Sequence, residues 1–174
     1  MLSRIDIRHK TVYLGLLLAI SLIFSYVDSL ILLFPMIPGA KLGLANLPVV
    51  ISLFLLGPVE ALTLTVLKAV LSSLLFGNAY SLAYSLGGAV LSFAVMFLIR
   101  KVKGIHIFTV SGMGGLFHNL GQLLVAFYIV KSKGVFIYLP YLTVMGTVTG
   151  SLLGALAQMI LPGLKKFVNK GEIS

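Results

Sequence analysis

Long uninterrupted apolar runs constrain the fold of this chain more than any other feature. They lie at about 12–34, 44–57, 59–76, 80–99, 108–130 and 139–161, and they take up most of the 174 residues. A helix needs about 20 mainly apolar residues to cross roughly 30 Å of hydrocarbon, and no run shows the period of two that is typical of a membrane barrel. Because only 10% of residues are charged, we predict an all-α integral membrane protein. It would be a six-transmembrane-helix bundle in one domain, 1–174.

The second and third runs are short and are separated only by Gly57 and Pro58. They could form one long helix or a re-entrant pair, and we interpret them as two helices. The distribution of lysine and arginine predicts the orientation, since cytoplasmic loops are rich in these residues. With the N-terminus inside, nine would face the cytoplasm (Arg4, Arg8, Lys10, Arg100, Lys101, Lys103, Lys165, Lys166 and Lys170) and three the outside (Lys41, Lys131 and Lys133).

The charge pattern therefore predicts a multi-pass membrane protein with both termini cytoplasmic. The net charge of +9 then reflects topology and attraction to anionic membrane lipid, and we expect no nucleic-acid partner. Four carboxylates, three scattered histidines and no cysteine leave little for catalysis. No nucleophile elbow or phosphate loop is present. We therefore predict no enzyme activity, no catalytic residue, no bound metal and no cofactor.

Lys68 is the most informative single residue, because it lies inside the third apolar run. An unpaired ammonium there costs about 2.5–3.5 kcal/mol on insertion scales, so the side chain should face the bundle interior or a wet cavity. Two interpretations remain open. Lys68 either forms a structural ion pair with Asp28 of the first run, or it meets an anionic group of a ligand.

Polar side chains also share one face of the fifth run. His118 and Gln122 are four residues apart, with Asn119 beside them, so they line the same side of a helix. They would form either a cavity wall or interhelical hydrogen bonds worth roughly 0.6 kcal/mol each. Small residues recur at four-residue spacing elsewhere and allow close helix packing: Gly146, Gly150 and Gly154 in the sixth run, and Gly15 and Ala19 in the first.

Several segments together resemble one bacterial membrane family. They are PGAKLGLANLP, GPVEA, SSLLFGN, YSLGGAVLS, HNLGQLLVA, YLP and TGSLLGALA. Over residues 12–161 or so the chain is similar to the Gx transporter family, also labelled heptaprenyl diphosphate synthase component I. That family in turn resembles the S components of energy-coupling factor (ECF) vitamin transporters, which have six helices, both termini inside and a ligand pocket near the outer face.

The resemblance implies a substrate-binding subunit of an ECF-type ABC importer for a small vitamin-like or precursor molecule. Its partners would be a T subunit, contacted by Gly15 and Ala19, and ATPase subunits. The loop after the first helix would be a lid bent by Pro35, Pro38 and Gly39. The expected substrate-binding residues are Lys41, Asn46, Lys68, Tyr80, Tyr84, His118, Asn119 and Gln122. The lysines favour an anionic ligand and the tyrosines an aromatic one.

Two alternatives belong to other functional classes. The chain has no two adjacent aspartates, so it lacks the DDxxD motif of trans-prenyl diphosphate synthases. It could still be a non-catalytic accessory subunit of prenyl diphosphate synthesis or of a membrane redox complex. The second alternative is a membrane-embedded enzyme that acts on a lipid diphosphate with His118 or Lys68 as acid-base groups. The scarcity of carboxylates weighs against this enzyme.

Overall fold

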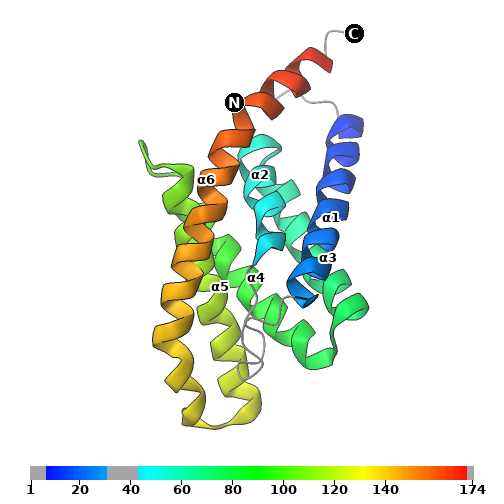
Figure 1. Cartoon of the computed structure of the whole chain (residues 1–174). Helices are drawn as coiled ribbons and strands as arrows, with labels where there is room; N and C mark the ends of the chain where they lie inside the picture. Colours follow the sequence, from blue (N-terminus) through cyan, green and yellow to red (C-terminus); the bar gives the residue numbers. More distant parts are fainter. Residues whose placement is uncertain (1–6, 31–42, 172–174) are drawn as a thin grey trace.

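The computed structural model describes residues 7–30 and 43–171, which contain helices and no strand. Figure 1 shows them as one elongated bundle. The α-helices of this described part are α1 (Ile7–Leu30), α2 (Leu47–Leu55), α3 (Pro58–Phe76), α4 (Ala79–Ile99), α5 (Ile107–Val130) and α6 (Leu139–Gly171). Two short 3-10 helices join them, η1 (Leu44–Asn46) and η2 (Lys133–Tyr138).

Within the described residues, five helices are long and apolar enough to cross a membrane, namely α1, α3, α4, α5 and α6. This is the composition of a multi-pass membrane protein. The prediction of six spanning helices is wrong for the run at 44–57. Its helix α2 has nine residues, about 14 Å at 1.5 Å per residue. The helix ends because Gly57 adopts a φ of 134°, a conformation that only glycine adopts readily.

Helix α2 is apolar on every side and is enclosed by its neighbours. Seven of its nine residues are buried, and it packs against α1, α3 and α6. A helix that is hydrophobic all round needs such a surrounding. The apolar core of the bundle lies here, and its largest fully buried side chains include Leu53, Leu64 and Leu161.

Basic residues gather at one end of the bundle, which we name the basic end. It holds the start of α1, the α2–α3 turn, the end of α4 and the last turns of α6 (Figure 1). Two contacts connect these parts: Lys10 Nζ lies 2.7 Å from Glu60 Oε1, and Arg100 Nη1 donates to the Leu53 carbonyl at 2.6 Å. The described residues at this end also include Lys101, Lys103, Lys165 and Lys166.

Helices α4, α5 and α6 pack through glycines. A Cβ on Gly115 of α5 would lie 2.1 Å from the carbonyl oxygen of Gly146 in α6. On the other side of α5, a Cβ on Gly121 would lie 2.6 Å from the carbonyl oxygen of Gly87 in α4. The close helix packing predicted for the glycines of the sixth run is confirmed, with α5 as the neighbouring helix. These contacts hold α5 at backbone distance from both neighbours.

Candidate ligand-binding site

A polar cavity lies inside this otherwise apolar bundle. It has a volume of about 70 Å³ for the centres of water-sized spheres, room for on the order of five waters. It extends from the middle of the bundle toward the end opposite the basic end, and each of the helices α1 to α6 contributes to its lining. The polar side chains on the lining are Ser25, Asp28, Asn46, Lys68, Ser72, Ser85, Ser92, Ser111, His118, Asn119, Gln122 and Thr149.

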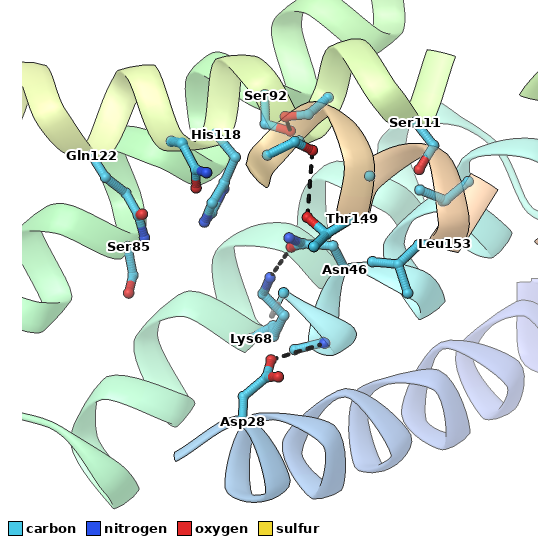
Figure 2. A pocket seen from close by; sticks show the side chains of 18 of the residues that line it. Asp28, Asn46, Lys68, Ser85, Ser92, Ser111, His118, Gln122, Thr149 and Leu153 are labelled. Carbon is cyan, nitrogen blue, oxygen red and sulfur yellow. Dashed lines mark hydrogen bonds between the residues drawn. The ribbon is translucent and has the colours of Figure 1, made fainter. Parts of the chain in front are cut away.

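One side of the cavity carries a cation and an anion. Lys68 of α3 and Asp28 of α1 are only 7% and 4% exposed, and both line the cavity. Lys68 Nζ donates to Asn46 Oδ1 at 2.5 Å, while Asp28 Oδ2 accepts from the Ala45 amide at 3.5 Å. Figure 2 shows these side chains on neighbouring segments. Both charged groups thus contact η1, which precedes α2.

Asn46, which accepts the hydrogen bond of Lys68, lies at the start of α2. It is the N-cap residue of α2, yet its side chain makes no capping hydrogen bond. Asparagine is among the residues preferred at an N-cap because its side-chain oxygen can accept from the first turn. Here that oxygen accepts from Lys68 instead. Asn46 therefore contributes to the cavity and not to the stability of the helix end.

His118 and Gln122 of α5 and Ser85 of α4 lie on another side of the cavity (Figure 2). The space beside them depends on Gly88 of α4. A Cβ there would lie 2.8 Å from Gln122 Cγ and 3.1 Å from His118 Cε1. The absence of a side chain at this position leaves room for both polar side chains between α4 and α5.

Serines and one threonine complete the polar lining, and sequence analysis missed them. Ser92 Oγ donates to the Gly114 carbonyl at 2.7 Å, and Thr149 Oγ1 donates to the Met145 carbonyl at 2.8 Å. A signal was present in the spacing, because residues three, four or seven apart share a helix face. Such pairs are Ser25 with Asp28, Lys68 with Ser72, and Ser85 with Ser92.

The structure brings five of the predicted substrate-binding residues together: Asn46, Lys68, His118, Asn119 and Gln122. Asn119 has a structural contact as well, since its Nδ2 donates to the Leu142 carbonyl of α6 at 2.8 Å. Its predicted interhelical hydrogen bond is thus present, alongside a place on the cavity wall.

Other predicted residues lie elsewhere. Tyr80 is 62% exposed, and neither it nor the half-buried Tyr84 is part of the described lining. Both belong to the first two turns of α4, where Ser85 and neither tyrosine is part of the described lining. Gly15 and Ala19 are exposed on the outer side of α1. Lys41 and the predicted lid residues Pro35, Pro38 and Gly39 lie outside the described residues.

The described residues offer no cluster of three or more His, Cys, Asp or Glu side chains that could hold a metal ion. The cavity lining within the same residues has one carboxylate, Asp28, and one imidazole, His118. Their neighbours are amides, hydroxyls and one ammonium. Such an arrangement can bind a molecule by hydrogen bonds and by charge.

Comparison with known proteins gives one result for this chain. The family model described as Heptaprenyl diphosphate synthase component I matches residues 17–160. The matched range contains all the described lining residues of the cavity, from Ser25 to Leu153. No curated protein and no solved structure matches the chain.

Proposed function

The chain belongs to the heptaprenyl diphosphate synthase component I family, and we propose that this member is the substrate-binding membrane subunit, or S component, of an ECF-type ABC importer. The single observation that carries the proposal is a cavity that is lined by helices of a membrane protein and carries many polar side chains. Buried polar and charged groups inside a membrane bundle are expensive and typically mark a substrate pathway. The substrate would be a small vitamin-like or precursor molecule.

The proposed setting is a bacterial cytoplasmic membrane, with the basic end and both termini in the cytoplasm. Positive charge at one end of the bundle supports this orientation. Helix α2 ends at the α2–α3 turn, which lies at the basic end, so α3 starts from the same side of the bundle as α1 (Figure 1). The cavity, which extends toward the opposite end, would receive its ligand from outside.

The protein would act as a binder, without catalysis. The sequence has no nucleotide-binding loop, so ATP hydrolysis would come from separate ATPase subunits, coupled through a T subunit. The outer side of α1 is a suitable docking surface for that T subunit, because Gly15 and Ala19 lie there among the exposed Val12, Leu16 and Ile20. Small residues allow helices to approach closely in a membrane.

Uptake by reconstituted proteoliposomes tests this proposal. The chain would be purified together with T and ATPase subunits and assayed, with and without internal ATP, for uptake of the small molecule that copurifies with it. We expect ATP-dependent uptake, and about a tenfold loss in Lys68→Met, because a charge-assisted hydrogen bond is removed. Lys133→Met, which alters an exposed lysine, is the matched control. Uptake by the isolated chain without partners or ATP would overturn the coupling scheme.

The family description favours a second candidate, a non-catalytic accessory subunit linked to prenyl diphosphate synthesis or to a membrane redox complex. This candidate predicts a stable protein partner and no retained small molecule. Affinity purification from the native membrane, followed by both protein and small-molecule mass spectrometry, separates the two functions. A stoichiometric synthase subunit without any bound molecule would favour the accessory role.

A further inference from the structure

The formal charges of the lysine and the carboxylate on the described cavity lining cancel. Lys68 contributes one positive charge and Asp28 one negative charge, and His118 is the one other lining residue with a side chain that can carry a charge. A diphosphate carries several negative charges, and burying it would require several cations or a metal held by carboxylates. The lining has no such set of groups.

The lining is also poor in the side chains that bind isoprenoid chains or flat rings. The chain has eleven phenylalanines and seven tyrosines, yet none of them lines the described cavity. The larger apolar side chains on the lining are Val50, Met96 and Leu153. Pockets for drug-sized or aromatic ligands are usually lined mainly by hydrophobic and aromatic side chains, so this cavity suits a different kind of molecule.

Hydrogen-bonding groups are instead distributed around the whole cavity. Serines come from α1, α3, α4 and α5, and amides come from η1 and α5. Hydroxyls and amides can both donate and accept, so together they match a ligand that carries donors and acceptors on several sides. The small volume of the cavity adds a limit on size.

We infer that the cavity binds a small, hydrophilic, non-aromatic molecule with no net charge, and that neither a prenyl diphosphate nor a flavin is its ligand. The inference rests on the proposed binding function and names its substrate class. Lys68 and Asp28 would contact groups of opposite polarity on the ligand. The hydroxyls and amides would bind the remainder.

The wild-type ligand provides the direct test. The full chain is purified from its native membrane in mild detergent, and the bound molecule is measured by native mass spectrometry and then released for an accurate mass. We expect a formula without phosphorus and no aromatic absorbance. Farnesyl diphosphate and flavin mononucleotide, added as probes, should not displace the molecule. A released phosphate ester, prenyl chain or flavin would overturn the inference and leave the binding function intact. An empty protein would overturn both.

Two charge variants give a second test, because whether each raises or lowers ligand occupancy depends on the charge of the ligand. For a ligand without net charge, Lys68→Met and Asp28→Asn should each lower occupancy about tenfold, because each leaves one buried charge unbalanced. The double variant should recover part of the loss, since its lining is again neutral. Higher occupancy in Asp28→Asn than in the wild type would indicate an anionic ligand and would overturn the inference. If a variant fails to fold, the mass of the wild-type ligand still decides.

Discussion

The two halves of the bundle are built by different means. Helices α4, α5 and α6 meet backbone to backbone, with glycines of one helix against glycines of the next. Helices α1 to α3 are joined largely by side chains. Lys10 of α1 pairs with Glu60 of α3, Lys68 of α3 bonds to Asn46 beside α2, and Ser21 of α1 donates to the Ala45 carbonyl at 3.4 Å.

The two halves therefore contribute different properties to the cavity: α4 to α6 set the geometry of its wall, and α1 to α3 carry its charged side chains. Close backbone packing fixes the positions of α4 to α6, so the polar side chains on them form a wall of defined geometry. The formal charges of the described lining come only from α1 and α3. We call α4 to α6 the glycine half. We therefore expect substitutions in the glycine half to affect folding first, and substitutions around Lys68 to affect binding first. Four experiments test this division.

The largest effect should come from Gly115→Ala. The new Cβ would lie 2.1 Å from a backbone oxygen of α6, so the helices must separate, and overpacking of this kind costs about 1–3 kcal/mol or more. Gly15→Ala is the control, because no atom lies within 4 Å of its added Cβ. We expect the temperature at which half of the detergent-solubilised protein loses its monodisperse elution peak to fall only in Gly115→Ala. Equal stability of the two variants would contradict close packing as the basis of this half.

Asn46→Ala should have the next largest effect, on binding. It removes the acceptor of Lys68, and we expect about tenfold lower retention of the copurifying molecule. Asn78→Ala is a matched control, since Asn78 is also an N-cap residue but its side chain does accept a hydrogen bond, from Ser81 N at 2.9 Å. This control should lose about 1 kcal/mol of stability and keep its ligand. The opposite pattern would show that Asn46 acts as a helix cap.

Asn119→Ala should have a smaller effect, on stability. The variant loses the hydrogen bond to the Leu142 carbonyl, which is worth roughly 0.6 kcal/mol in a membrane protein. Thermal unfolding in detergent measures this loss, and native mass spectrometry measures ligand retention beside it. A drop in ligand retention as large as that of Asn46→Ala would show that Asn119 contributes to ligand binding as much as Asn46 does.

Tyr80→Ala should have the smallest effect of the four. The side chain is 62% exposed and lies outside the described lining, so we expect ligand retention and thermal stability near those of the wild type. Retention is again measured by native mass spectrometry. A clear loss of ligand retention would support the predicted contact between Tyr80 and the ligand.

Sequence analysis predicted the helical membrane fold well, because long apolar runs have few other solutions. It also found Lys68, Asn46, His118, Asn119 and Gln122, since large polar groups stand out within such runs. It missed the serines on the lining, because hydroxyls are common in membrane helices and only their three-dimensional convergence distinguishes them. It included Tyr80 and Tyr84, since a sequence does not show which side chains of the first turns of α4 point into the cavity. The length of α2 also required the structure, because the preceding segment contains apolar residues as well.

The shortness of α2 has a consequence for ligand size. A full span needs about 20 residues, so this helix of nine residues covers less than half of that length. The cavity borders the start of α2, with Ala45, Asn46 and Val50 on its lining. The first turn of α2 therefore forms the bottom of the cavity. Each helical turn gained or lost there would shorten or lengthen the cavity by about 5.4 Å.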